Sequence, residues 1–215
     1  MELVWNKAGN DSEVLILAHG AGAGMNSDFM ERIAELLYSS GITVVRFEFD
    51  YMQQRRETGS KRPPDRQPKL LACWKQAIEL VYEQVQKPVF IGGKSMGGRM
   101  ATLLAADQAR DKADQMTLPF KGVVCLGYPF YAPGKMDKPR TEHLEQLQTP
   151  VLILQGDRDI MGNLENVSTY SLSSAVNIDW LPDGNHDLKP RVSSGYTQND
   201  HLKLAVERIK QFAGG

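Results

Sequence analysis

One serine lies in a sequence pattern that favours nucleophilic chemistry. Ser95 is the central residue of the Gly-x-Ser-x-Gly pattern at residues 93–97. An apolar run, residues 89–91, precedes this pattern, and a run of helix-forming residues, 98–107, follows it. A strand, a sharp turn and a helix in this order form a nucleophile elbow, which places the hydroxyl at the positive end of the helix dipole. The sequence therefore predicts that Ser95 is a nucleophile.

Two later loops contain the groups that would activate this serine. A serine hydroxyl needs a base within hydrogen-bond reach, and the base needs an orienting carboxylate. Asp159 and His186 each follow an apolar run, in the Ser, Asp, His order of α/β-hydrolases. We predict that His186 Nε2 accepts the Ser95 proton and that Asp159 binds the other ring nitrogen. Asp157 competes for the acid role, but the Gly-x-x-Asp spacing from Gly156 favours Asp159 and leaves Asp157 as a turn or capping residue.

Three other histidines compete with His186 for the role of base. His19 precedes a glycine-rich loop, and we expect it to fix that loop by hydrogen bonding. His143 lies in an apparent surface helix, and His201 begins the last predicted helix. His186 is therefore the favoured base.

The negative oxygen of a tetrahedral intermediate would need two N–H donors. The backbone N–H of Met96, directly after the serine, is the first candidate. The N–H of Ala21, in the glycine-rich loop after His19, is the second, with Gly22 as the neighbouring alternative.

A substrate pocket is expected around these groups. Its candidate residues are Gly22, Arg46, Tyr128, Phe130 and Met161. The aromatic and methionine side chains would form apolar walls, and they could equally belong to the core. Arg46 lies near a strand end, where it could meet a substrate carboxylate, although a salt bridge with Asp50 or Glu48 is favoured. Lys94 is expected to stay solvated or to pair locally.

Strands and helices alternate along the chain. Apolar runs predict strands at residues 14–18, 42–49, 89–91, 122–126, 151–155 and 176–181. Apolar residues at helical spacing predict helices at residues 28–37, 70–85, 98–107 and 202–212. This alternation predicts an α/β fold with a mostly parallel sheet and helices on both faces. Ligands bind at the carboxyl ends of the strands in such sheets, where the candidate loops lie.

Two connecting segments have consequences for the site. Residues 51–69 are polar, basic and proline-containing, and they are interpreted as a long surface loop, with the basic part at 55–69. Only about 24 residues separate the strand ending at Leu126 from the one starting at Val151, which excludes a large cap domain. The pocket is therefore expected to be shallow and open.

Composition limits the function classes. The 215 residues predict a single domain, 1–215, and the net charge of −1 gives no basic excess for nucleic acid. The N-terminus lacks a signal-peptide pattern and no apolar run could span a membrane, so a cytoplasmic protein without membrane contact is expected. Cys73 and Cys125 are expected to be buried free thiols.

The sequence predicts neither a metal nor a cofactor. Its His, Cys and acidic residues lack the spacing of zinc ligands. The Gly-Lys-Ser at 93–95 is similar to the end of a phosphate-binding loop, but Pro88 stands where that motif needs glycine.

Four segments together resemble a narrower family. They are Leu17-Ala18-His19-Gly20-Ala21-Gly22, Val45-Arg46-Phe47-Glu48-Phe49, Gly92-Gly93-Lys94-Ser95-Met96-Gly97-Gly98-Arg99 and Leu126-Gly127-Tyr128-Pro129-Phe130. This is the small, dienelactone-hydrolase-like family that includes the testis-expressed hydrolase-like protein and a subunit of the non-specific lethal chromatin complex. The resemblance covers nearly the whole chain. It implies a single-domain α/β-hydrolase fold and hydrolysis of small or short-acyl esters or thioesters.

Departures from the family pattern lie beside the site. The family commonly has proline where this chain has Asp50, Asp-Pro-Phe-Gly where it has residues 159–162, and Asp-His-Ser where it has residues 185–187. These changes concern substrate preference more than mechanism. Two alternatives to a hydrolase stay open: an interaction module on a hydrolase scaffold, and an acyltransferase that uses the same acyl-enzyme.

Overall fold

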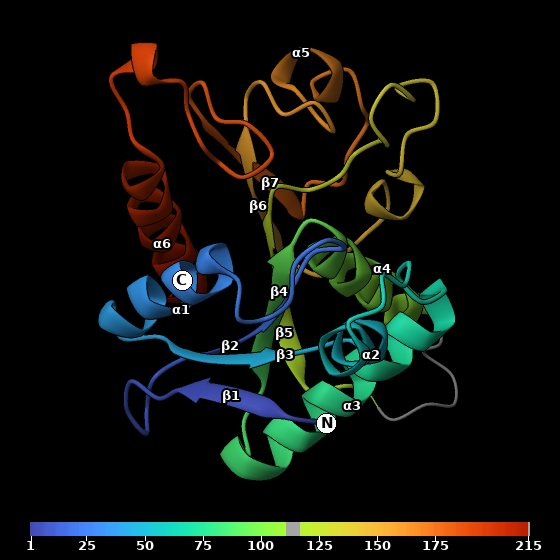
Figure 1. Ribbon diagram of the computed structural model, residues 1–215, viewed down its shortest axis with the longest axis vertical. Coiled ribbons are helices and arrows are strands. Elements are labelled where there is room, and N and C mark those ends of the chain that lie inside the picture. The colour runs from blue at the N-terminus through green and yellow to red at the C-terminus, as the bar shows by residue number, and fades with distance from the viewer. Residues whose placement is uncertain (111–116, 215) are drawn as a thin grey trace.

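A seven-stranded sheet forms the centre of the computed structural model, which describes residues 1–110 and 117–214 (Figure 1). The strands are β1 (Leu3–Asn6), β2 (Val14–Ala18), β3 (Thr43–Phe47), β4 (Val89–Lys94), β5 (Phe120–Leu126), β6 (Val151–Gly156) and β7 (Val176–Leu181). Their order in the sheet is β1-β3-β2-β4-β5-β6-β7. All neighbouring strands in this sheet pair in parallel except β1, which pairs with β3 antiparallel.

Each of the six runs predicted as strands forms a strand, with ends that differ by a few residues. Strands β2, β3, β4 and β6 are buried along their whole length, which explains their continuous apolar sequences. The edge strand β1 was not expected. All four of its residues are half-buried, so its sequence lacks the apolar run by which the other strands are recognised.

Helices cover both faces of the sheet, as predicted. They are α1 (Asp28–Ser39), α2 (Asp50–Thr58), α3 (Gln67–Val85), α4 (Met96–Arg110), α5 (Leu164–Val167) and α6 (Gln198–Gly214), with 3₁₀ turns η1 (Glu142–Leu144) and η2 (Val192–Ser194). Helices α1 and α6 pack together on one face, and α3 and α4 on the other (Figure 1). Each pair of helices packs against one face of the sheet and buries a separate cluster of apolar residues there. The sheet lies between the two clusters, so together they form one domain.

The interpretation of residues 51–69 as one long loop is wrong. Helix α2 takes its first part, α3 begins at Gln67, and the loop is limited to residues 59–66. Only Tyr51 and Met52 of α2 are buried, so the helix lacks the apolar stripe that would have predicted it. Pro68 stands in the first turn of α3, where proline needs no backbone N–H partner.

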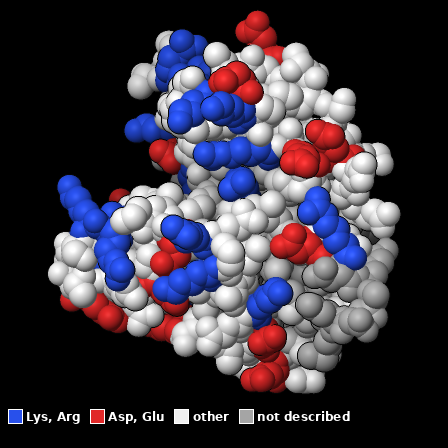
Figure 2. Space-filling view, turned by 90° about the vertical axis from the view of Figure 1, so that its right-hand side faces the viewer, with Lys and Arg blue, Asp and Glu red and all other residues white. Residues whose placement is uncertain are grey.

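Acidic residues partly neutralise the basic residues of this region. Lys69 pairs with Asp50 and Asp65, and Arg56 pairs with Glu48. On the face that carries α2, α3 and α4, Lys and Arg side chains stand beside Asp and Glu (Figure 2). Two of the six basic residues at 55–69 therefore form ion pairs within the fold.

Short segments connect the strands near the site. Residues 127–150, between β5 and β6, contain the turn η1 and form no cap domain, as expected from their number. Within residues 1–110 and 117–214, no helix is both long and apolar enough to cross a bilayer. Cys73 and Cys125 are buried and free, as predicted.

Candidate active site

Ser95 stands on a sharp turn between β4 and α4. Its φ of 51° lies in the left-handed region, which a residue other than glycine adopts at a cost of about 1–3 kcal/mol. Two backbone bonds hold the turn: the Ser95 N–H donates to Leu126 O at 3.0 Å, and the Arg99 N–H donates to Ser95 O at 3.0 Å. The predicted elbow is therefore present, and it holds strain at the serine itself.

The glycines of the pattern are explained by contact with β2. A Cβ at Gly93 would lie 2.2 Å from the carbonyl oxygen of Ala18, and one at Gly97 would lie 2.5 Å from the same atom. Neither position has room for a side chain. The pattern thus allows the elbow to pack directly on the end of the neighbouring strand.

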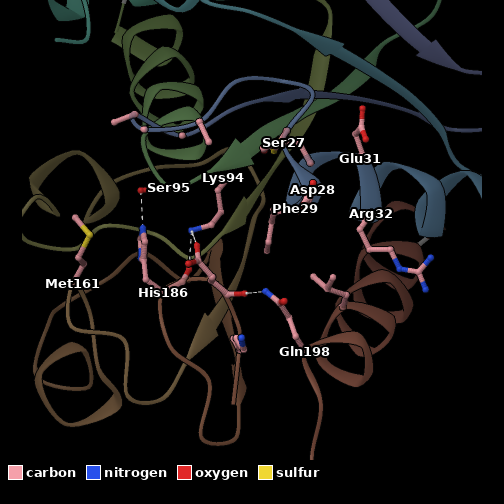
Figure 3. Close-up of a pocket in the computed structure, with 18 of the residues that line it drawn as sticks. Ser27, Asp28, Phe29, Glu31, Arg32, Lys94, Ser95, Met161, His186 and Gln198 are labelled. Carbon is pink, nitrogen blue, oxygen red and sulfur yellow. Dashed lines mark hydrogen bonds and ion pairs between the residues drawn. The ribbon is translucent and has the colours of Figure 1, made fainter. Parts of the chain in front are cut away.

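The structure brings the three predicted residues into one hydrogen-bonded chain. His186 Nε2 lies 2.8 Å from Ser95 Oγ (Figure 3), and His186 Nδ1 lies 2.7 Å from Asp159 Oδ2. Ser95 follows β4, Asp159 follows β6 and His186 follows β7, so all three come from the carboxyl ends of strands. The geometry matches a nucleophile, a base and an orienting acid.

Asp159 is fully buried and has hydrogen-bond partners at both carboxylate oxygens. Gln155 Nε2 donates to Oδ2 at 2.8 Å, and the Met161 N–H donates to Oδ1 at 2.8 Å. A buried carboxylate needs such donors to replace the water it has lost. The Gln155 amide also binds the backbone of Tyr128 and Gly162, so it ties the acid to the loop after β5. Sequence reasoning missed Gln155. A polar residue inside an otherwise apolar, buried strand could have indicated that Gln155 has a specific hydrogen-bonding role.

The other histidines have partners away from Ser95. His19 is fully buried, donates from Nδ1 to Gly20 O at 2.6 Å and accepts the Phe49 N–H at Nε2, so it holds the glycine-rich loop as expected. Burial lowers the pKa of His19, which keeps the ring neutral. His143, on η1, is half-buried and bonds to Thr102. His201 is buried and bonds to Leu188 O.

The loop after β2 is held so that its N–H groups can face the elbow. The Tyr51 hydroxyl donates to Gly20 O at 3.2 Å and Ala21 O at 3.1 Å. Because the C=O and N–H of a trans peptide point in opposite directions, holding these carbonyls turns the N–H groups of Ala21 and Gly22 the other way. A Cβ on Gly20 would lie 3.6 Å from Ser95 Cβ, so the loop passes beside the serine. Sequence reasoning missed Tyr51 because its region was interpreted as a loop.

Met96 supplies the second candidate donor. It is the first residue of α4, and the first N–H groups of a helix have no acceptor in a preceding turn. The candidate donors are thus the Ala21 N–H, on the loop after β2, and the Met96 N–H, at the start of α4.

An open groove of about 1220 Å³ runs over Ser95 between α1 and the loop before α6. Gly22 and Met161 line it, as predicted, together with Ala21, Phe29 and Arg32 (Figure 3). Lys94 also lines the groove, and its ammonium donates to the carbonyl of His186 at 2.7 Å. Lys94 was expected either to stay solvated or to pair locally, and the structure shows local pairing.

Three predicted pocket residues lie outside the groove. Tyr128 and Phe130 are fully buried in the core, where their rings pack edge to face, and the Tyr128 hydroxyl donates to Arg140 O. Arg46 is buried and donates to Met25 O at 2.7 Å.

The expected salt bridge of Arg46 is also absent from the described residues. Glu48 pairs with Arg56, and Asp50 pairs with Lys69. Helix α2, which the sequence did not predict, brings Arg56 to Glu48 from eight positions away and so provides the acid with another partner.

Among residues 1–110 and 117–214, no three His, Cys, Asp or Glu side chains lie together in a way that could hold a metal ion.

Comparison with solved structures finds this fold in several proteins. An alpha-beta serine hydrolase homologue from Coxiella burnetii has a TM-score of 0.67 and 20% identity, over 96% of this chain and 90% of that one. A dienelactone hydrolase from Anabaena variabilis has a TM-score of 0.67 and 20% identity, over 97% and 89%. A serine hydrolase without a lid from Xanthomonas campestris has a TM-score of 0.64 and 20% identity, over 96% and 88%.

A family model described as an alpha/beta hydrolase domain matches residues 11–214. This range includes every strand except β1 and all three residues of the hydrogen-bonded chain. The protein therefore belongs to the alpha/beta hydrolase domain family.

Proposed function

We propose that this protein is a serine hydrolase that cleaves small or short-acyl carboxylic esters or thioesters through an acyl-enzyme on Ser95. The observation that carries the proposal is the chain of hydrogen bonds from Ser95, which lines the groove, through His186 to the buried Asp159. The family membership and the fold shared with esterases and hydrolases support the same reaction class.

Acylation follows from the positions of these groups. Ser95 Oγ attacks the carbonyl carbon as its proton moves to His186 Nε2, and the carbonyl oxygen becomes negative. The N–H groups of Ala21 and Met96 stabilise that oxygen. Asp159 stabilises the imidazolium, which then gives its proton to the leaving alcohol or thiol as the tetrahedral intermediate collapses.

Deacylation repeats these steps with water. His186 removes a proton from a water molecule, whose oxygen attacks the acyl-enzyme, and the acid is released when Ser95 Oγ regains the proton. The open groove favours water over another acceptor, because no cap domain among the described residues excludes solvent. Openness also favours small or short acyl groups, since a long chain would find no enclosed tunnel.

The direct test is labelling with a fluorophosphonate probe followed by intact mass and peptide mapping. We expect a single adduct, on Ser95, in the wild type and none in Ser95→Ala. Turnover of short-chain p-nitrophenyl esters should fall by about 10⁴-fold or more in Ser95→Ala. Well-folded wild type that neither reacts with the probe nor turns over any ester would contradict the proposal and favour the interaction-module alternative.

The narrower dienelactone-hydrolase-like grouping, with its chromatin-complex subunit, stays a prediction. The dienelactone hydrolase among the structural neighbours supports the grouping at the level of the fold.

A further inference from the structure

Lys94 precedes the proposed nucleophile and has a buried ammonium group. It is the last residue of β4, and only 9% of its side chain is exposed. Lysine is rarely buried, because an ammonium removed from water needs other hydrogen-bond partners to replace it. The partners of this group therefore indicate why the lysine is inside.

Both polar partners of Lys94 belong to the loop that carries the proposed base. Its Nζ donates to the carbonyl oxygen of His186 at 2.7 Å and lies 3.2 Å from Asp187 Oδ1 (Figure 3). The Phe29 ring of α1 lies beside the ammonium, with its centroid 5.5 Å away. Burial lowers the pKa of Lys94, and the Asp187 carboxylate opposes that change.

The loop from β7 to α6 depends on such local bonds for its shape. Asp183 and Leu188 both have a φ of 57°, so the chain turns sharply on either side of His186. The Asn185 side chain accepts the N–H groups of Asp187 and Lys189, which shapes the loop from within. The bond from Lys94 is different, because it connects the loop to the elbow.

The absence of a side chain at Gly127 leaves space for the long Lys94 side chain to reach the His186 carbonyl. A Cβ at Gly127 would lie 2.5 Å from this oxygen and 3.3 Å from Lys94 Nζ. Glycine at this position therefore leaves room for the ammonium to reach the carbonyl. In the described part of the chain, Lys94 makes the one hydrogen bond that this carbonyl accepts.

We propose that Lys94 is a positioning residue that sets the place of the His186 imidazole relative to Ser95 by holding the backbone carbonyl of His186. This inference rests on the proposed function. Asp159 holds the ring at Nδ1, and Lys94 holds the backbone end of the same residue. Because Lys94 and Ser95 are consecutive, the same segment of backbone carries the nucleophile and this hold on the base.

The test compares Lys94→Met with Lys203→Met. Lys203 is an exposed lysine of α6 that does not line the groove, so its loss removes the same charge and leaves the His186 carbonyl bond intact. Active sites are titrated with the fluorophosphonate probe, and kcat and KM for p-nitrophenyl acetate are measured per titrated site. We expect kcat to fall by about 10- to 100-fold in Lys94→Met, with KM within about twofold, because a shift of about 1 Å is costly to catalysis. Lys203→Met should stay within about twofold of wild type in both constants.

Two further variants separate positioning from folding. Lys94→Gln keeps a polar side chain, but this side chain is one atom too short to reach the His186 carbonyl. Its kcat should therefore fall like that of Lys94→Met. If Lys94→Met does not fold, Lys94→Gln provides the test in its place. Lys94→Arg retains a cation with N–H donors and should recover part of kcat. A merely structural lysine would lower the titrated fraction and the thermal midpoint while kcat per site stayed at the wild-type value.

Wild-type kcat per titrated site in both Lys94→Met and Lys94→Gln would overturn the positioning role while leaving the proposed function intact. A wild type without an adduct on Ser95 would instead overturn the proposed function itself, so the two failures are distinguishable.

Discussion

One of the two donors expected for the negative oxygen, the Ala21 N–H, depends on a residue outside the groove. Tyr51 is fully buried, and its hydroxyl binds the carbonyls of Gly20 and Ala21 on the side of the loop opposite to the N–H groups. His19 binds the Gly20 carbonyl as well. The loop therefore keeps one orientation before any substrate arrives, and electrostatic stabilisation of a transition state needs such preorganisation.

Removal of this hydroxyl in Tyr51→Phe should lower kcat about 5- to 10-fold with little change in KM, since one hydrogen bond contributes about 1 kcal/mol. Tyr128→Phe is the matched control, because its buried hydroxyl bonds to Arg140 O away from the groove. Steady-state kinetics on a p-nitrophenyl ester would measure both. Equal kcat in the two variants would contradict a role for Tyr51 in the loop.

A second residue prediction concerns the acid. Asp159→Asn keeps the size of the side chain but removes the charge that faces His186 Nδ1. We expect kcat to fall by about 10³- to 10⁴-fold, since an amide also favours the wrong imidazole tautomer. Asp157→Asn, on the same loop, should stay within about threefold of wild type. The reverse result would assign the acid role to Asp157, the alternative that the sequence left open.

At the scale of elements, the elbow works because β4 and α4 approach β2 without side chains between them. Gly97 lies against the carbonyls of Ala18 and His19, at 2.5 and 2.7 Å from its would-be Cβ. Those carbonyls belong to the end of β2 and the start of the glycine-rich loop. A change at Gly97 would therefore disturb the elbow and the loop together.

Gly97→Ala should lower the free energy of unfolding by about 2 kcal/mol or more, because the contact is with backbone that has little room to move. Gly22→Ala is the control on the same side of the site, since a Cβ there meets nothing within 4 Å. Urea unfolding followed by circular dichroism would compare them. Similar midpoints would mean that the close contact at Gly97 relaxes at little cost.

At the scale of the whole molecule, the half-buried His143 links stability to pH. Burial lowers the pKa of His143 from 6.5 to about 4, and the Arg99 and Arg110 charges add to this effect. Between pH 4 and 6.5 the unfolded chain binds the proton and the folded chain does not. Stability therefore falls as pH decreases through this range, and this one group accounts for up to about 3 kcal/mol.

The variant His143→Gln should lose that part of the pH dependence while keeping a polar partner for Thr102. Urea unfolding at pH 7.5 and pH 5 would measure it: the wild type should lose more stability on acidification than the variant. His19, whose pKa burial also lowers, contributes with the same sign to both proteins and cancels in the comparison. Parallel losses would show that His143 is protonated without cost in the folded state.

Local chemistry in the sequence was enough to predict the parallel sheet and the meeting of Ser95, Asp159 and His186. Buried strands produce continuous apolar runs, and the carboxyl ends of parallel strands lie along one edge, so residues that follow those runs must come close together. The Gly-x-Ser-x-Gly pattern also predicted the sharp turn at Ser95, because its two glycines are the residues that fit against β2.

Only the tertiary structure decided what surrounds those three residues. Helix α2 has no apolar stripe, so neither it nor the role of Tyr51 could be read from periodicity. Tyr128 and Phe130 could have faced either the groove or the core, and in the fold both are buried in the core. Lys94 is a charged residue whose place depends on a carbonyl 92 positions away in the sequence. Such contacts depend on how separate loops pack against each other, a matter that no local pattern of side chains encodes.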